Sequence, residues 1–319
     1  MKKSIPLNQS PLFRLRNRTK LAELIGLPKN FFRKPINFDD QYIDFSKPKK
    51  HGDGLRYFST PKGKEIALIQ ERLFCLLDRI ERPYWVKSGQ KGESYITNAD
   101  AHKLNKYGMK TDISSFYESV SFSKIRGCFL DKFQMSSDLA EIMTKLVTHN
   151  RKIPTGGAAS MLVAYYAYED MFDKIHTYAE QNGITFTLYV DDLSFSSSRP
   201  ITAEHFSIIR SIIQSYGLHT KWQKTNFYTK GKYREYTGVG INSKGKLIVP
   251  NHMREDIINT YKDCRVDSTN MKKLERLQGK VNAANQIEQG IFPQIRLYLI
   301  EKSKELKKYR RERSQDHIE

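Results

Sequence analysis

Three aspartates are the residues of this sequence best suited to chemistry. Asp112 follows the alternating run Met109-Lys110-Thr111, and Asp191-Asp192 follow a second alternating run that starts at Ile184. Each acid therefore lies at the end of a predicted strand, where a side chain is solvated and rigidly placed. Carboxylates paired at such tips can hold hard divalent cations, and phosphoryl transfer to a hydroxyl uses two Mg²⁺ ions. The simpler alternative is that an Asp pair merely ends a strand, because Asp favours turns.

The apolar pattern predicts the elements that position these acids. A strand is expected around Asp112, a long helix from Gly157 to Gly183, a hairpin over 184–196, a helix from Thr202 to Gly217 and a further strand near Thr220. Strand, helix, hairpin, helix and strand predict an α+β fold with a split βαβ, ferredoxin-like sheet and helices on one face. Asp191 and Asp192 are then the tip of the hairpin.

Composition and charge limit the kinds of molecule that this protein is expected to bind. The chain has 319 residues, a formal net charge of +19, and 17 Phe, 18 Tyr and 2 Trp. The length predicts two or three subdomains, and the apolar content excludes a wholly disordered protein. Cations with many aromatic rings suit nucleic acid, which offers phosphates and bases. Three scattered cysteines predict neither a disulfide framework nor a zinc knuckle. We expect a cytoplasmic protein, because no run approaches a membrane span or a secretion signal.

The sequence around the acids resembles reverse transcriptases in three blocks. Tyr189-Val190-Asp191-Asp192 fits their YxDD signature, and Lys110 to Tyr117 resembles their first catalytic block, an Asp followed five residues later by an aromatic. Between them, Ile153 to Ser160 resembles the Pro-Gln-Gly block that opens a long helix. The order of the blocks agrees over most of residues 50–260. The three blocks together favour a catalytic site over a simple strand end.

The resemblance implies a right-hand polymerase with fingers, a ferredoxin-like palm and a helical thumb. Applied to this chain, it predicts a basic N-terminal helical arm over 1–35 and a basic helical thumb over 249–319. The fingers are expected over 36–110 and, after an interruption, over 127–150. The palm is expected over 111–126, with the first catalytic Asp, and over 151–248, with the YxDD hairpin and the strands that follow it.

The resemblance also implies roles for individual residues. Asp112, Asp191 and Asp192 would be the catalytic acids that bind two Mg²⁺ ions. Tyr117 would lie under the sugar of the incoming dNTP and exclude a 2′-hydroxyl, although a core aromatic is the alternative. Arg56 would reach the triphosphate, for which a guanidinium fork is suited.

Two further implied roles concern the leaving group and the template. Lys224 would stand near the triphosphate as a proton donor to pyrophosphate. Pro154, Thr155 and Gly156 would handle template and primer. The family's Gln is Thr155 here, and the shorter side chain cannot make the same amide contacts near the template base.

Two blocks point to retron reverse transcriptases within the family. Asn98-Ala99-Asp100-Ala101-His102 matches their NAxxH block, and Tyr236-Thr237-Gly238 resembles their VTG block with Tyr in place of Val. Asn98, His102, Tyr236, Thr237 and Gly238 are therefore candidates for recognition of a noncoding RNA. The alternative for the first block is a helix start, because Thr97 and Asp100 form a capping-box pattern.

A retron enzyme implies a specific reaction and partners. It binds its own structured noncoding RNA, starts DNA synthesis from a guanosine 2′-hydroxyl in that RNA, and makes branched RNA–DNA (msDNA) from dNTPs. Members commonly work with an effector protein in anti-phage defence, and no membrane partner is implied. The alternatives are a defence-associated reverse transcriptase outside the retrons, a stand-alone intron-type enzyme, or a catalytically silent RNA-binding module.

Overall fold

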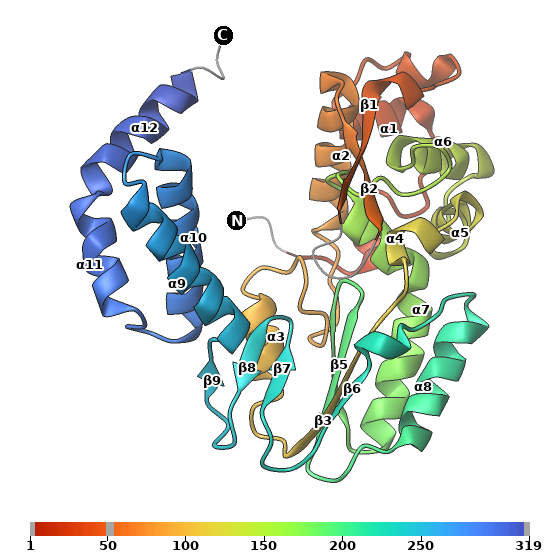
Figure 1. Ribbon diagram of the computed structural model, residues 1–319. Helices are drawn as coiled ribbons and strands as arrows, with labels where there is room; N and C mark the ends of the chain where they lie inside the picture. Colours follow the sequence, from red (N-terminus) through yellow and green to blue (C-terminus); the bar gives the residue numbers. More distant parts are fainter. Residues whose placement is uncertain (1–3, 49–53, 316–319) are drawn as a thin grey trace. The chain divides into compact units, whose positions relative to one another are not determined.

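A computed structural model of the chain describes residues 4–48 and 54–315 (Figure 1). Parts of three predicted segments, at the start of the N-terminal arm, inside the fingers and at the end of the thumb, lie outside the described residues. The chain divides into two compact units. The first comprises the described parts of residues 1–94, 109–195 and 201–226, and the second those of 95–108, 196–200 and 227–319. Each unit has its own hydrophobic core.

A four-stranded sheet carries the predicted acids. Its strands are β3 (Tyr107–Asp112), β4 (Thr185–Tyr189), β5 (Asp192–Ser197) and β6 (Asn226–Tyr228), in the order β4-β5-β3-β6. Numbered along the chain, this order is 2-3-1-4, which is the ferredoxin-like arrangement. The long helix α7 (Ser160–Gln181) and helix α8 (Ala203–Ser215) lie side by side against one face of the sheet (Figure 1). The predicted α+β class and split βαβ sheet are confirmed. The last strand was predicted too early, because β6 begins at Asn226 and Thr220 forms only an isolated bridge with Ile113.

Local sequence explains both helices. In α7, large apolar side chains recur on nearly every face, as expected of a helix buried in the centre of a unit. Helix α8 begins with a capping box, in which the Thr202 hydroxyl accepts from the His205 amide and the Thr202 amide donates to His205 Nδ1. The apolar stripe Phe206, Ile209 and Ile213 then faces the core.

The rest of the first unit surrounds α7. It contains a hairpin of β1 (Tyr42–Pro48) and β2 (Leu55–Pro61), together with helices α1 (Arg18–Ile25), α2 (Lys64–Leu77), α4 (Phe116–Ser119), α5 (Phe122–Gly127) and α6 (Ser137–Val147). A π-helical turn, Cys128–Lys132, follows α5. The predicted basic arm differs from expectation in one respect. Leu21, Ala22 and Ile25 bury one side of α1 in the core, so the helix of the described arm is packed against the unit while its cations are exposed.

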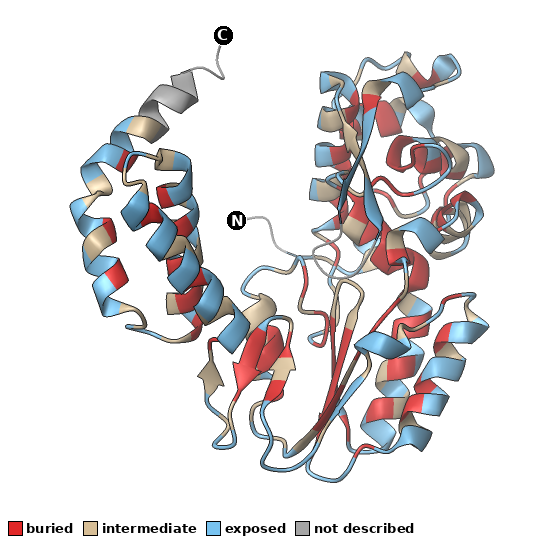
Figure 2. Ribbon diagram, viewed as in Figure 1, coloured by how far each residue is buried: buried red, intermediate tan, exposed pale blue. Residues whose placement is uncertain are grey.

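The second unit joins two short elements to the C-terminal helices. It contains α3 (Tyr95–Asp100), the three-stranded sheet β7 (Arg234–Tyr236), β8 (Val239–Ile241) and β9 (Leu247–Ile248), and helices α9 (Asn251–Val266), α10 (Met271–Ile287), α11 (Pro293–Glu301) and α12 (Ser303–Gln315). Ala99, Tyr236 and Val239 belong to the same buried cluster as residues of α9 and α10. Figure 2 shows buried stretches in β7 and β8 and along these helices. The units therefore divide the chain differently from the predicted fingers, palm and thumb, because residues 95–108 and 227–248 share their core with the C-terminal helices.

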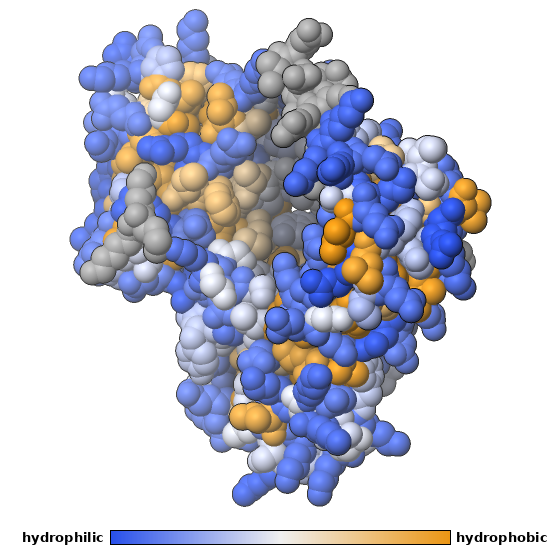
Figure 3. All heavy atoms as spheres, turned by 90° about the vertical axis from the view of Figure 1, so that its left-hand side faces the viewer, coloured by the Kyte–Doolittle hydropathy of each residue, from blue (hydrophilic) through white to orange (hydrophobic). Residues whose placement is uncertain are grey.

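The surface is largely polar. The face drawn in Figure 3 is mostly hydrophilic, with separate hydrophobic patches. Across the described residues, no helix has both the length and the apolar content that a membrane crossing requires.

Candidate active site

The three predicted acids meet at one end of the four-stranded sheet. Asp112 is the last residue of β3, and Asp192 is the first residue of β5. Val190 and Asp191 form the two-residue turn between β4 and β5. The Ile113 amide donates to the Asp191 carbonyl at 3.1 Å, which ties the turn to the end of β3. The backbone thus brings the three acids together on adjacent strands, as predicted.

The turn itself is strained. Val190 has φ of +61°, a left-handed conformation that is costly for a β-branched residue. A positive φ at the first of two turn residues occurs in tight hairpins, where Gly is usual. The Val190 amide donates to Ser88 Oγ at 3.0 Å, and this bond helps to hold the conformation. Ser88 is a supporting residue that our sequence reasoning missed, since it lies in a segment that reads only as loop.

Burial and like charge raise the pKa values of two of the acids, Asp191 and Asp192. Burial, then the carboxylates of Asp112 and Asp192, raise the pKa of Asp191 to about 7. The pKa of Asp192 is also raised, chiefly by burial and then by Asp112, while nearby lysines oppose the shift. Asp112 itself is 4% exposed. The structure thus holds three acids close enough to repel one another, which is the electrostatic setting that a bound cation would relieve.

Two lysines lie against Asp112. Lys224 Nζ donates to Asp112 Oδ2 at 2.7 Å, and Lys221 Nζ lies 3.3 Å from the same oxygen. Burial works against the charged form of Lys224, but the hydrogen bond to Asp112 and the neighbouring acids outweigh it and raise the pKa of Lys224. Lys221 was not among the predicted residues, although its spacing of three from Lys224 on a turn was a usable signal. The structure brings Lys224 to the acids from the short turn Trp222–Lys224, which precedes the strand β6 that it was predicted to follow.

The donor chemistry fits a hard cation. Carboxylate oxygens are the ligands that Mg²⁺ prefers, and mutual repulsion among the acids favours a cation between them. In the described part of the chain, no group of three or more His, Cys, Asp or Glu side chains has the arrangement of a metal site. Asp112 is instead engaged with Lys221 and Lys224, so a cation bound there would compete with their ammonium groups.

Tyr117 lies beside this cluster. It is in α4, just after Ser115, whose φ of +48° turns the chain out of β3. Burial, then the Asp191 charge, raise the pKa of Tyr117 to about 12, while Arg56 opposes the shift. The Tyr117 ring is half-buried, with Phe116 packed at a centroid distance of 6.0 Å. The Tyr117 ring therefore packs against Phe116 and also lies close to Asp191. Arg56 lies close enough to lower the pKa of the Tyr117 hydroxyl.

Residues 154–156 are held against β2. The Ser59 amide donates to Thr155 Oγ1 at 3.0 Å, and the Gly156 amide donates to the Ser59 carbonyl at 2.8 Å. A Cβ on Gly156 would lie 2.4 Å from Thr60 Oγ1, so only glycine permits this approach. Pro154 accepts from Ser160 Oγ at 2.6 Å. The Thr155 hydroxyl, which stands where the family has Gln, is engaged in this backbone contact.

The NAxxH-like and VTG-like blocks come together in the second unit. Asn98 and His102 are fully buried, and the His102 ring stacks on Tyr236 at a centroid distance of 4.5 Å. Asn98 Nδ2 donates to Thr237 Oγ1 at 3.2 Å. Thr237 and Gly238 both have positive φ and form the two-residue turn between β7 and β8. The two blocks, 139 positions apart at this bond, therefore contact each other.

This placement bears on their predicted role in RNA recognition. Tyr236 is fully buried, as are Asn98 and His102, so their side chains face the protein interior. Thr237 is half-buried and Gly238 is exposed at the turn. Tyr236, Asn98 and His102 therefore pack in the protein interior. From there they can influence RNA binding only through the loops that they hold in place.

Comparison with known proteins identifies the family. The model of the family described as "Reverse transcriptase (RNA-dependent DNA polymerase)" matches residues 58–241, more than half of the chain. The chain belongs to the reverse transcriptase family. The matched residues include every predicted site residue except Arg56.

The relatives are retron enzymes. This reverse transcriptase is 25% identical to the Retron Se72 reverse transcriptase of Salmonella heidelberg, over 57% of its own length and 48% of the relative. It is 23% identical to the Retron Mx162 reverse transcriptase of Myxococcus xanthus, over 75% of its own length and 56% of the relative. The chain thus spans about half the length of these curated relatives. The predicted resemblance to retron-type reverse transcriptases is confirmed.

A solved structure supports the fold. Telomerase from Candida albicans, in complex with a TWJ fragment of telomeric RNA, matches with a TM-score of 0.50 at 10% identity, over 80% of this reverse transcriptase and 55% of that chain. At this identity the likeness concerns the fold alone. It agrees with the predicted α+β right-hand polymerase.

Proposed function

We propose that this protein is the RNA-directed DNA polymerase of a retron and that it adds deoxynucleotides by two-metal-ion nucleotidyl transfer. The observation that carries the proposal is the meeting of Asp112, Asp191 and Asp192 at the end of the sheet, with the pKa of Asp191 raised to about 7. Lys221 and Lys224 offset the repulsion among the three acids only in part, since the pKa values of Asp191 and Asp192 stay raised, and a bound cation would relieve the rest. Membership of the reverse transcriptase family supports the same chemistry.

The chain's own residues supply positioning and proton transfer in this proposal. Asp112, Asp191 and Asp192 would hold two Mg²⁺ ions, which when bound activate the attacking hydroxyl and stabilise the leaving pyrophosphate. Tyr117 would support the sugar of the dNTP, and Arg56 would bind its triphosphate through a guanidinium fork. Lys224, protonated because of its acidic neighbours, would give a proton to the departing pyrophosphate. Residues 154–156, fixed against β2, would hold the template close to the fingers hairpin.

Tyr117→Ala tests the selection of deoxynucleotides. Removing the ring would open space where a ribonucleotide carries its 2′-hydroxyl, so we expect discrimination against ribonucleotides to fall by at least about tenfold. The measurement is the ratio of kcat/KM for dNTP and rNTP in primer extension. Tyr117→Phe is the matched control and should keep the discrimination, because it retains the ring. An unchanged ratio in Tyr117→Ala would assign Tyr117 to packing against Phe116.

Lys224→Met tests the proton donor. Loss of general acid catalysis should slow nucleotide addition by about 10²-fold. The same change removes an ammonium group from Asp112, so half-maximal activity should need less Mg²⁺. Lys221→Met is the comparison, because it removes the more distant ammonium without removing the proposed donor. Single-turnover extension across a Mg²⁺ titration separates the two effects, and a normal rate in Lys224→Met would exclude the role.

The retron part of the proposal concerns the RNA. We propose that the protein copies part of a cognate structured noncoding RNA from a guanosine 2′-hydroxyl, giving branched msDNA, and that it works with an effector protein in anti-phage defence. The NAxxH-like and VTG-like blocks and the similarity to retron reverse transcriptases support this reading.

Isolation of the protein from its native locus tests the priming reaction. Nucleic acid that copurifies with the protein should contain a DNA strand joined to RNA through a 2′–5′ bond, which debranching enzyme cleaves. The Asp191→Asn protein should carry the RNA without the DNA. Linear cDNA without a branch would instead favour a reverse transcriptase outside the retrons. Loss of protection against phage in the same variant would link synthesis to defence.

A further inference from the structure

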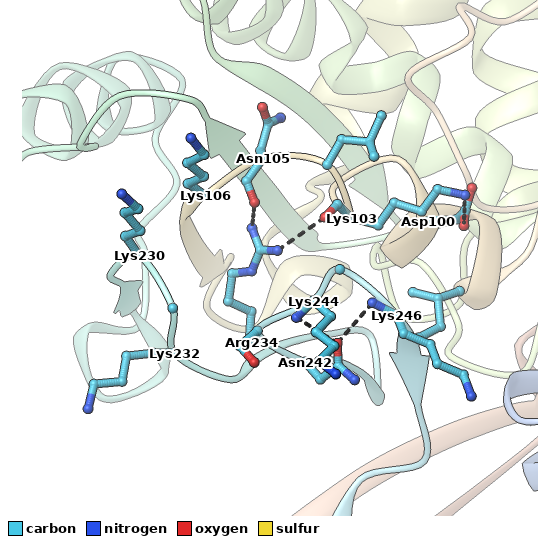
Figure 4. Close-up of a pocket in the computed structure, with 15 residues that line it drawn as sticks. Asp100, Lys103, Asn105, Lys106, Lys230, Lys232, Arg234, Asn242, Lys244 and Lys246 are labelled. Atoms are coloured by element: carbon cyan, nitrogen blue, oxygen red, sulfur yellow. Dashed lines mark hydrogen bonds and ion pairs between the residues drawn. The ribbon is translucent and has the colours of Figure 1, made fainter.

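A basic pocket outside the three-acid cluster opens on the surface of the second unit. It has a volume of about 700 Å³ and is lined entirely by residues of that unit (Figure 4). Three chain segments form its walls: the turn 103–106 after α3, the turn 230–234 before β7, and the loop 242–247 between β8 and β9. The proposed catalytic roles use none of these residues.

The lining is strongly cationic. It contains seven basic side chains and a single acid, Asp100. Asp100 is paired with Lys103 at 2.8 Å, and Arg234 donates to the backbone carbonyls of residues 103 and 105. The remaining five lysines have no acidic partner among the described residues: Lys106, Lys230, Lys232, Lys244 and Lys246. Figure 4 shows these side chains extending from the three walls, while Arg234 turns inward to the backbone.

Four of these lysines come from two copies of the same turn. Lys230-Gly231-Lys232 and Lys244-Gly245-Lys246 each have a central glycine in the left-handed region, with φ of +77° and +76°. A left-handed residue between two lysines reverses the chain tightly, and only glycine adopts it without cost. The repeated turn therefore presents two pairs of ammonium groups on two walls of one pocket.

Hydrogen bonds and close contacts hold both turns. In the first turn, the Lys232 amide donates to the Thr229 carbonyl at 3.2 Å. Asn242 Oδ1 accepts from the amides of Lys244 and Lys246, each at 3.0 Å. A Cβ on Gly245 would lie 2.9 Å from the Lys103 carbonyl oxygen, so this turn is in close contact with the first wall. The Tyr233 ring covers Gly240 of β8, where a Cβ would approach it to 2.6 Å. The lysines thus stand on backbone whose shape is already set.

The family blocks hold the first wall. His102 Nδ1 and Asn105 Nδ2 both bond Ser196 Oγ, at 2.7 Å and 2.8 Å, and the His102 ring stacks on Tyr236. Arg234, two residues before Tyr236, binds the backbone of the same turn. The buried residues of the two blocks therefore act as positioning residues for the pocket.

We propose that this pocket binds the sugar–phosphate backbone of a double-stranded RNA stem. Cations on three walls suit several phosphates of one backbone. The lining has no aromatic side chain on which an unpaired base could stack, and its one guanidinium is occupied by backbone carbonyls. Duplex RNA is recognised by shape and backbone contacts, whereas single strands are recognised largely by stacking. That the stem belongs to the cognate noncoding RNA rests on the proposed function, whereas the duplex chemistry does not.

The test compares binding of two RNAs by two charge variants. The pocket variant changes Lys230, Lys232, Lys244 and Lys246 to Gln, and the control variant changes four exposed lysines of the first unit to Gln: Lys29, Lys34, Lys64 and Lys174. Both are made in the Asp191→Asn background, so no DNA synthesis interferes. The probes are an RNA duplex of about 16 base pairs and one of its single strands, and the readout is fluorescence anisotropy between about 50 and 200 mM salt.

The expected result is specific to the pocket and to the duplex. The pocket variant should bind the duplex roughly 10²-fold more weakly, and its slope of log affinity against log salt should fall by about 3. The control variant and a variant with Arg at the four pocket positions should bind as the parent does. Hydrogen exchange of β7 and β8 establishes that the fold is kept, and the pairwise variants 230/232 and 244/246 replace the quadruple one if it is not.

Two results would overturn the proposal. One is equal loss of duplex affinity in the pocket and control variants, and the other is a parent protein that prefers the single strand. Synthesis by the wild-type protein on poly(rA)/oligo(dT) is measured separately, so failure of the polymerase proposal is distinguishable from failure of the pocket.

Discussion

Asp191→Asn is expected to abolish DNA synthesis while the protein remains folded. Asparagine has nearly the shape of aspartate but lacks the charge that would hold a cation at the hairpin tip. If the proposed ions supply several kcal/mol of transition-state stabilisation, their loss slows nucleotide addition by about 10³-fold or more. Extension of oligo(dT) on poly(rA) with Mg²⁺ measures the effect. Asp40→Asn, which removes an exposed acid of the same unit, is the control and should be fully active.

The same variant makes a prediction about stability. The pKa of Asp191 is raised in the folded state from its ordinary value of 3.8 to about 7. The folded protein therefore binds this proton more tightly than the unfolded chain does, and the stability of the wild type falls as pH rises from 3.8 to about 7. Asparagine does not titrate, so the Asp191→Asn variant should not lose this stability as the pH rises.

Thermal melting in EDTA checks the sign of the effect. Asp191→Asn should melt at or above the temperature of the wild type, with a larger gap at about pH 8 than at about pH 5. A variant that still makes cDNA would contradict the two-metal assignment. A variant that melts well below the wild type at pH 8 would contradict the repulsion among the three acids.

Tyr236→Ala is expected to unfold the second unit preferentially. Tyr236 is among the largest fully buried side chains, with His102 stacked on one side and Tyr228 packed edge-on at 5.6 Å. Truncating such a ring in a core costs about 3–5 kcal/mol, because a cavity remains. Tyr236→Phe keeps both ring contacts and should cost much less.

Hydrogen exchange locates this effect better than a melting temperature, since a chain with two units need not unfold in one step. Protection of β7, β8 and α10 should fall in Tyr236→Ala, whereas protection of α7 should not. If Tyr236 instead contacted RNA directly, the variant would lose RNA affinity at unchanged protection. Unchanged protection in β8 would therefore contradict the packing role.

The sequence predicted the end of the sheet that carries the three acids well because its signals are local. Alternation up to Asp112 and from Ile184 to Tyr189 predicts two strands, and the Asp pair between two alternating runs predicts a hairpin tip. The turn is in fact one residue earlier, at Val190-Asp191, and Asp192 begins β5. The cap at Thr202 and the glycine at Gly217 bound α8 in the same direct way. The resemblance to reverse transcriptases added the connection between these pieces, which alternation alone does not supply.

Other features depend on contacts that no local pattern reveals. The sequence around Asn98 predicts a helix start at the surface, whereas the side chain is buried and bonds Thr237, 139 positions later. The sequence shows Thr155 only as the loss of the family's amide, whereas its bond to the Ser59 amide depends on the hairpin of β1 and β2. The basic pocket was missed altogether, although the repeat of Lys-Gly-Lys fourteen positions apart (230 to 244) was visible in the sequence.

The core of the second unit joins distant parts of the chain, and this affects how the protein folds during synthesis. Its core joins Ala99 to Leu274, Leu277 and Leu306, so α3 leaves the ribosome long before the helices that bury it. Contacts this distant close slowly, and apolar surface exposed meanwhile favours aggregation. The first unit, complete by residue 226, can fold during synthesis. In a nascent chain stalled before α10, the three-acid cluster should therefore be folded while the second unit is still incomplete. Such a chain should depend on chaperones until its last helices emerge.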